Sequence, residues 1–118
     1  MANPELVEDG EELIVVLLLA SDYKFIDSGI GTTAPIKANT GMESACAEAR
    51  DSAVQSEGDT ASIYKLVVTH TYNGIFAITE AGVFSVITAG VLFIRGTFAA
   101  INVSSGDKIE FTITLEIL

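Results

Sequence analysis

The chain has 118 residues, of which 49% are hydrophobic and 19% charged, and its formal net charge is −10. This size indicates one domain, and the apolar content is ample for a packed core, which excludes a disordered chain. The six Lys and Arg residues form no cluster, so the composition argues against nucleic acid or an anionic membrane surface as a partner.

The first twenty residues predict a helix or an arm. Asn3 and Pro4 suit the start of a helix, and acids follow where the helix dipole favours them. We therefore expect a helix from Pro4 to Leu19, with a break at Gly10 as a variant. Adjacent β-branched valines leave a strand over Leu13–Leu19 as the competing interpretation. This apolar run is far shorter than the roughly twenty residues that cross a membrane, and the acids before it are unlike a signal peptide.

The middle of the chain predicts short elements joined by loops. Tyr23–Ile26 alternates briefly, as a strand does. Asp27–Pro35 is rich in turn-forming residues and predicts a loop. Thr40–Arg50 favours a short helix or an irregular turn. Ala53–Gln55 begins another strand, and a turn at residues 57–59 follows.

The second half begins with a clear strand pattern. One face of Tyr64–Tyr72 carries Tyr64, Leu66, Val68, His70 and Tyr72. No second metal-ligating residue accompanies His70, so we predict a hydrogen-bonded core or interface histidine rather than a metal ligand. Asn73-Gly74 tolerates positive φ and predicts a tight hairpin into a strand at Ile75–Thr79.

The remaining elements predict an all-β ending. In order they are a bend or bulge at Ala81-Gly82, a strand Val83–Ile87, a turn Ala89-Gly90, a strand Val91–Ala100 with a bulge at Gly96, a turn Ser104–Asp107 and an alternating strand Lys108–Ile117. Short strands separated by turns indicate a sandwich. We predict a mainly β fold, an antiparallel, jelly-roll-like β-sandwich with a short N-terminal helix, forming a single domain of residues 1–118.

Glu80 interrupts an otherwise apolar run from Ile75 to Ile87. A buried carboxylate requires a partner, so we predict a structural ion pair with Arg95, or bonds to turn amides. A catalytic acid would need a second carboxylate or a nucleophile close by in the sequence pattern, and none is visible there.

Other candidate sites favour structural interpretations. Gly29-x-Gly31 resembles the front of a dinucleotide-binding motif, but the third glycine is missing and Pro35 stands where a helix should run, so a surface loop is predicted. Cys46 is the single cysteine and is expected to be a small, half-buried side chain. We predict no catalytic residues, no metal and no cofactor, and hence no enzyme.

Several segments, in their order and spacing, resemble a group of small virion-associated proteins of tailed phages. The segments are Gly29-Ile-Gly-Thr-Thr-Ala-Pro35, Ile78-Thr-Glu-Ala-Gly-Val-Phe84, Ala100-Ile-Asn102, Ser105-Gly-Asp107 and the final strand Lys108–Ile117. The resemblance covers residues 5–118 and implies a virion component with a β-sandwich core. It carries no catalytic residue with it.

The resemblance leaves two functions open. The first is a capsid decoration or cement protein on the outer capsid surface of the virion, with the major capsid protein and itself, as a homotrimer, for partners. Apolar side chains between Ile75 and Phe98 would supply an interface, and a loop would contact the capsid through Gly29, Ile30, Gly31, Thr32, Thr33, Pro35 and Ile36. The alternative is a tail-tip or fibre module that binds a host surface glycan. Tyr23, Tyr64 and Tyr72 are available for such a site, although Tyr64 and Tyr72 share the apolar strand face and are expected in the core.

Overall fold

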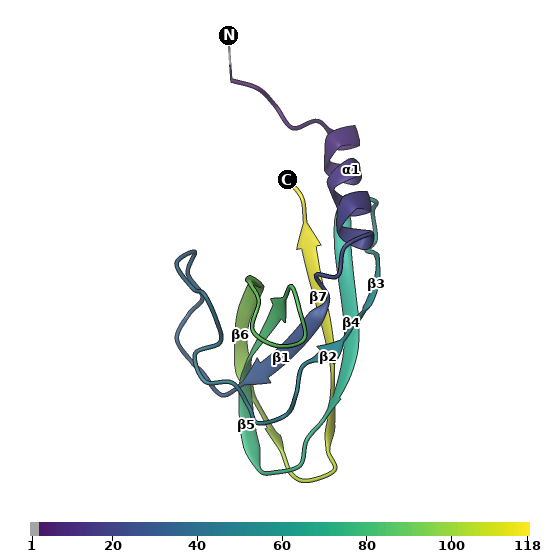
Figure 1. Cartoon of the computed structure of the whole chain (residues 1–118). Helices are drawn as coiled ribbons and strands as arrows, with labels where there is room; N and C mark the ends of the chain where they lie inside the picture. Colours follow the sequence, from purple (N-terminus) through teal and green to yellow (C-terminus); the bar gives the residue numbers. More distant parts are fainter. Residues whose placement is uncertain (1–2) are drawn as a thin grey trace.

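The protein, described over residues 3–118 by a computed structural model, is mainly β (Figure 1). The helix is α1 (Glu8–Leu19), and the strands are β1 (Phe25–Gly29), β2 (Asp51–Ser52), β3 (Val54–Glu57), β4 (Ile63–Thr71), β5 (Phe76–Phe84), β6 (Leu92–Val103) and β7 (Lys108–Glu116). The expected fold class is confirmed, since two antiparallel sheets pack together beside one short N-terminal helix. No helix in this part of the chain is long and apolar enough to cross a membrane.

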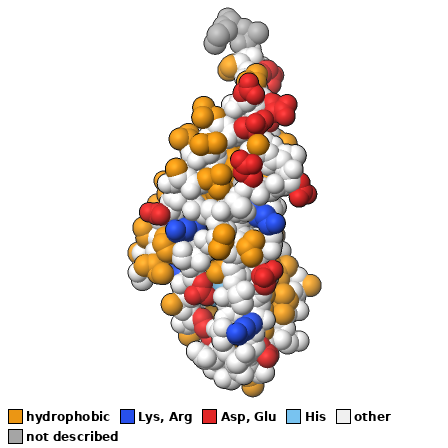
Figure 2. Space-filling view, turned by 90° about the vertical axis from the view of Figure 1, so that its right-hand side faces the viewer, with side chains coloured by type: hydrophobic (Ala, Val, Ile, Leu, Met, Phe, Trp, Pro, Cys, Tyr) orange, Lys and Arg blue, Asp and Glu red, His pale blue; other side chains and the backbone are white. Residues whose placement is uncertain are grey.

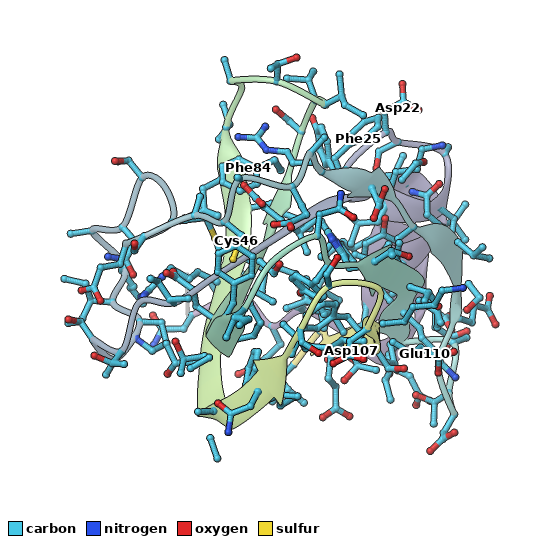
Figure 3. All side chains as sticks on the ribbon, turned by 90° about the horizontal axis from the view of Figure 1, so that it is seen from below. Asp22, Phe25, Cys46, Phe84, Asp107 and Glu110 are labelled. Carbon is cyan, nitrogen blue, oxygen red and sulfur yellow. The ribbon has the colours of Figure 1, made fainter. Side chains whose placement is uncertain are left out.

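The two sheets divide the strands in an order that differs from the order along the chain. One sheet has the order β2-β1-β5-β6 and the other has the order β3-β4-β7. Seen along the long axis, Phe84 of the first sheet and Glu110 of the second lie on opposite sides of the molecule (Figure 3). The inner faces meet in a core that includes Ile26, Ile78 and Phe111.

The alternating strands form as predicted. The face of β4 that carries Tyr64, Leu66, Val68, His70 and Tyr72 is buried, and so are the first inward residues of β7, Ile109 and Phe111. These two strands pair in register over their whole length, from Ile63 opposite Glu116 to Thr71 opposite Lys108. The alternation of apolar and polar residues, with one face buried, therefore predicted both strands correctly.

The helix is shorter than predicted. It begins at Glu8 instead of Pro4, and Val7 before it is extended, with ψ of 165° and no side-chain cap. Gly10 lies within the helix, and the alternative strand over residues 13–19 is wrong. Short helices are stabilised mainly by packing. Only the later turns pack, because Val15 is fully buried and Leu18 contacts the core, whereas residues 3–7 are exposed.

The carbonyl end of α1 is held by a side chain from the second sheet. Gln55 Nε2 donates to the carbonyl oxygens of Leu18 at 3.0 Å and Ser21 at 2.9 Å. The Tyr64 hydroxyl lies 2.7 Å from the same nitrogen, whose two hydrogens are shared among these three acceptors, and that hydroxyl donates to the carbonyl of Tyr23 at 3.0 Å. The last turn has no basic residue, so these bonds replace the usual cationic side chain at a helix C-terminus.

The predicted hairpin at Asn73-Gly74 is wrong. It joins β4 to β5, which belong to different sheets, and neither residue is among those with positive φ in the described chain. Instead, Tyr72 pairs with the turn before β7: its N–H donates to the Asp107 carbonyl at 2.8 Å, and the Gly106 N–H donates to its carbonyl at 2.7 Å. Long-range pairing with β7 has overridden the local turn preference.

Several boundaries also need correction. β1 extends into the segment predicted as a loop and ends at Gly29. Of the two alternatives predicted for residues 40–50, the irregular turn is the one that forms. β5 is continuous through Ala81-Gly82, and Gly96 pairs normally with Ala81. Two register shifts lie elsewhere: residues 98–100 of β6 stand opposite Thr79 alone, and a second shift falls between Val83 and Phe84. The turn at Ala89-Gly90 is confirmed, with φ of 57° and 75°.

Candidate functional site

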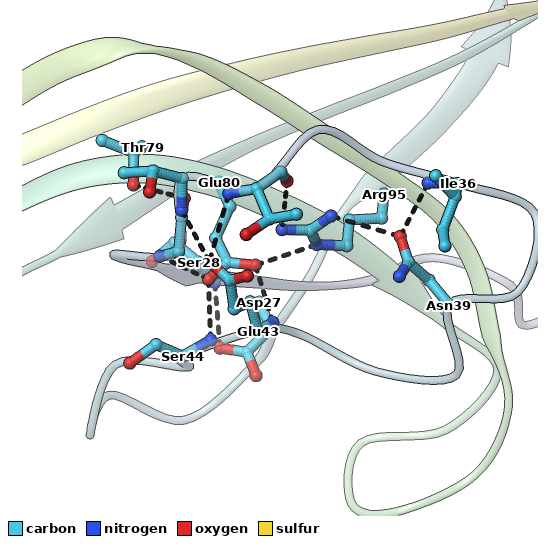
Figure 4. Close-up of polar contacts among 12 residues, drawn as sticks. Asp27, Ser28, Ile36, Asn39, Glu43, Ser44, Thr79, Glu80 and Arg95 are labelled. Atoms are coloured by element: carbon cyan, nitrogen blue, oxygen red, sulfur yellow. Dashed lines mark hydrogen bonds and ion pairs between the residues drawn. The ribbon is translucent and has the colours of Figure 1, made fainter.

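Glu80 and Arg95 lie on neighbouring strands and form an ion pair (Figure 4). Glu80 stands opposite Thr97, and Arg95 lies two residues before Thr97 in β6, which makes Glu80 and Arg95 diagonal neighbours on one face of the sheet. The Arg95 Nε atom is 3.0 Å from Glu80 Oε1, and the side chains are 3% and 0% exposed. The structure therefore brings together the two residues that the sequence predicts as a pair.

Glu80 also binds backbone amides from a distant loop. Its Oε2 accepts hydrogen bonds from the N–H groups of Gly31 at 2.6 Å and Ser44 at 2.9 Å, and its Oε1 accepts one from Glu43 at 3.0 Å. Burial alone would raise the pKa of Glu80, but these amides and Arg95 outweigh it and leave the pKa below its ordinary value. The carboxylate is thus ionised and both of its oxygens are occupied.

Arg95 binds the same loop at two further points. Its Nη1 donates to Asn39 Oδ1 at 3.2 Å, and its Nη2 donates to the Thr33 carbonyl at 3.1 Å. Asn39 Oδ1 in turn accepts the N–H of Ile36 at 3.0 Å. The planar guanidinium therefore fixes both the outgoing and the returning chain of the loop, a geometry that a lysine cannot reproduce.

Two more side chains complete the network. Glu43 Oε1 accepts the N–H groups of Thr32 at 2.8 Å and Thr33 at 3.2 Å. Bonds from the hydroxyl and then the amide of Thr33 lower the pKa of Glu43. The Thr79 hydroxyl donates to the Gly31 carbonyl at 2.6 Å. We call residues 30–44 the anchored loop; it projects from the sandwich near the edge formed by β6 (Figure 1).

The Gly29-x-Gly31 motif now has a steric explanation. A Cβ atom on Gly31 would overlap Glu80 Oε2 and lie 2.5 Å from the Cβ of Glu43. A Cβ on Gly29 would overlap the Ser44 carbonyl oxygen. Glycine is needed here so that the backbone can approach a carboxylate, and the structure places no helix after the motif as a dinucleotide site requires.

A second polar cluster, which sequence reasoning missed, holds the turn between β5 and β6. Arg50 Nη1 donates to the carbonyls of Val86 at 3.0 Å and Ala89 at 2.6 Å. The guanidinium lies 3.6 Å from the ring centroid of Phe84, a cation–π geometry, and its Nε is 3.8 Å from Asp27 Oδ2. No local pattern marks this cluster, because its members come from three separate segments of the chain.

His70 is a buried, hydrogen-bonded histidine, as predicted. Its Nε2 lies 3.0 Å from the carbonyl oxygen of Ile26 in the opposite sheet. Because a carbonyl oxygen can only accept a hydrogen bond, Nε2 is protonated and acts as the donor. Its Nδ1 lies 3.3 Å from Asp51 Oδ2 but makes no hydrogen bond of good geometry. His70 is 1% exposed, and it joins the two sheets inside the core.

The Cys46 thiol and the Tyr72 hydroxyl are both protonated at neutral pH. Cys46 is half-buried, and burial raises the pKa of its thiol to about 11, so it stays protonated at neutral pH. Burial likewise raises the pKa of Tyr72 to about 12, and its hydroxyl donates to Ser28 Oγ at 2.8 Å. Among the described residues, no group of three or more His, Cys, Asp or Glu is arranged to hold a metal ion.

The tyrosines considered for glycan binding are not equivalent. Tyr64 and Tyr72 are fully buried, which confirms that they belong to the core, whereas Tyr23 is 44% exposed. Of the residues predicted for a capsid-contact loop, Ile30, Thr32, Thr33, Pro35 and Ile36 are exposed. Gly29 and Gly31 are buried instead, and they serve the attachment of the loop.

No protein-family model matches this chain, and no curated protein matches it either.

Proposed function

We propose that the chain is a non-catalytic virion structural protein, a decoration or cement protein that binds the outer capsid shell of a tailed virus and stabilises it. Its partners would be the major capsid protein and further copies of itself, arranged as a homotrimer. The resemblance of the Gly29–Pro35 and Ile78–Phe84 segments to phage virion proteins supports the class. These same segments contain Gly31 and Glu80, and the hydrogen bond between them attaches the anchored loop to β5.

The observation that carries the proposal is the attachment of an exposed loop to a buried ion pair. Glu80 and Arg95 are almost fully buried, and together they bind Gly31, Thr33, Asn39, Glu43 and Ser44 of the loop. A loop held in this way loses little conformational entropy when it binds. The Glu80 carboxylate has lost its free acceptor sites and its pKa is lowered, which suits anchoring better than proton transfer.

The loop presents apolar side chains on this rigid frame. Ile30 is 45% exposed and Ile36 is 64% exposed, with Pro35 between them. Neither isoleucine side chain takes part in the network under the loop. We propose that these residues, with Thr32 and Thr33, contact the capsid surface. Many equivalent copies on a shell would add up weak contacts of this size.

The first test is quantitative mass spectrometry of purified virus particles from the source, scaled to the major capsid protein. A decoration protein should approach one copy per capsid subunit. A handful of copies per particle would move the chain to the tail or a vertex. Absence from the particle would overturn the structural function.

A second test addresses the loop itself, with shells assembled from the major capsid protein of the same particle as the probe. Ile36→Glu should weaken co-sedimentation with the shells while leaving thermal unfolding unchanged, because the side chain is exposed and outside the network. Ile75→Glu is the matched control, since Ile75 is 86% exposed and lies before β5. Equal shell binding by both variants and the wild type would reject the loop as the contact.

A further inference from the structure

The turn between β5 and β6 and the start of β6 carry an exposed apolar surface beside the anchored loop. It borders a cavity of about 690 Å³ whose apolar lining includes Tyr23, Val86, Val91, Leu92 and Phe93. We call these five residues the Phe93 surface. The rings of Tyr23 and Phe93 are 5.8 Å apart at 53°, and Val91 is 70% exposed. Aromatic and aliphatic side chains of this kind are typical of the centre of a protein interface.

The backbone under the Phe93 surface is held in one conformation. Arg50 Nη1 donates hydrogen bonds to the carbonyls of Val86 and Ala89 in the turn. Ser85 and Val91 pair across the turn, with the Ser85 N–H donating to the Val91 carbonyl at 3.0 Å and the Ser85 hydroxyl accepting the Val91 N–H at 2.9 Å. An apolar surface on such a frame does not have to be ordered when a partner binds.

The distribution of charged side chains indicates which partner could bind the Phe93 surface. The chain carries a net charge of −10, so two copies repel each other wherever carboxylates face carboxylates. Carboxylates gather where α1 begins (Figure 2), with Glu8, Asp9 and Glu11 in its first turn. The Phe93 cavity has one acidic lining residue, Asp22, whose carboxylate is 3.9 Å from Lys24 Nζ. On the other side of Phe93, Lys37 lines an adjoining hollow.

We infer that the Phe93 surface is the contact between copies of this chain. A partner chosen for opposite charge would be drawn to the acidic start of α1, whereas identical acidic chains must meet where acids are scarce and apolar atoms are exposed. The inference deepens the proposed function and rests on the part of it in which several copies act together. It assigns that contact to Tyr23, Val91 and Phe93 in place of the broad stretch from Ile75 to Phe98.

The test is analytical ultracentrifugation of the purified full chain over a wide range of concentrations. The wild type should sediment as an oligomer at high concentration. Phe93→Ser should weaken association by about thirtyfold or more, which is the loss expected for a central aromatic contact. Val91→Glu should do the same with no risk to the fold, because Val91 is largely exposed. Ile75 is 86% exposed and lies at the opposite end of β5 from this turn, so Ile75→Glu should associate as the wild type does.

The dependence of self-association on salt concentration provides a second, independent test. Added salt screens repulsion between acidic chains, so self-association through an acid-poor apolar contact should strengthen as ionic strength rises. A wild type that stays monomeric at every concentration and salt level would overturn the inference, and so would an oligomer unaffected by both substitutions. Such a failure is distinct from failure of the proposed function, because a monomeric chain would still be counted in purified particles by mass spectrometry.

Discussion

The amide of Gly31 lies 2.6 Å from the Oε2 atom of Glu80, although 49 positions separate the two residues in the chain. One belongs to an exposed loop and the other to the middle of a buried strand. The contact is possible because Gly31 has no side chain. It is needed because Glu80 is fully buried and cannot be solvated by water. The first two predictions below follow from this contact.

Gly31→Ala should destabilise the protein by about 1–3 kcal/mol, as overpacking of a filled site does. The new methyl group would overlap Glu80 Oε2 and press on Glu43, so the carboxylate would lose amide donors. Urea unfolding at pH 7 measures the change. Gly41→Ala is the matched control, because a Cβ there meets no atom within 4 Å, and it should change the free energy of unfolding by less than about 0.5 kcal/mol.

Glu80→Gln should destabilise the protein at pH 7 by about 3–5 kcal/mol, because Arg95 would remain buried without its counter-charge. The effect should depend on pH. Since the folded pKa of Glu80 is below its ordinary value of 4.5, its ionisation stabilises the fold fully above that value. This stabilisation is lost as pH falls through the lower, folded pKa. Wild type and variant should therefore converge in stability under acid conditions.

Urea midpoints across a pH series provide the measurement for Glu80. Glu110→Gln is the control, since Glu110 is an exposed residue of β7 and its replacement should change the free energy of unfolding at pH 7 by less than about 0.5 kcal/mol. A Glu80→Gln variant as stable as the wild type at pH 7 would show that the ion pair is not structural.

Tyr72→Phe should cost about 1 kcal/mol, the usual net value of one buried hydrogen bond. Only the hydroxyl that donates to Ser28 Oγ is removed, and the packing of the ring is retained. The change in urea midpoint checks this value. Tyr23→Phe, at an exposed position, should be close to neutral, and an equal loss for both variants would contradict the assignment.

Arg50→Lys should loosen the turn between β5 and β6 without unfolding the sandwich. A lysine cannot both stack on Phe84 and bind the carbonyls of Val86 and Ala89 with one planar group. Hydrogen exchange should quicken by about tenfold for the amides of Ser85 and Val91, equivalent to about 1.4 kcal/mol of local stability. Unchanged exchange there, or equal acceleration at the Ser104–Asp107 turn, would argue against a local role.

The sequence was sufficient for elements whose signal is local. β7 alternates between apolar and polar residues, and its inward side chains Ile109 and Phe111 are buried as expected. The need of Glu80 for a partner could also be predicted, because a lone carboxylate in an apolar run has few alternatives. The helix was predicted in kind, but its start was not, because packing of Val15 rather than the capping residues decides which turns form.

The remaining features depend on contacts that no local pattern encodes. Asn73-Gly74 has the composition of a hairpin, yet Tyr72 pairs with Gly106 and Asp107 and sends the chain to the other sheet. Most donors to Glu80 are backbone amides, which every residue type except proline supplies, so their identity leaves no mark in the sequence. Asn39 and Glu43 lie in an irregular segment whose shape is set by β5 and β6.

The position of these anchors separates the loop into two kinds of residue. Its attachment points are fixed by Glu80 and Arg95, and Asn39 binds Arg95 from the returning chain. The neighbouring residues Lys37, Ala38 and Thr40 are exposed and contribute no side chain to the network. A foreign peptide inserted after Thr40 should therefore leave Asn39 in place and the sandwich beneath it undisturbed. The molecule thus has the organisation of a display scaffold, with a buried anchor and a replaceable surface segment.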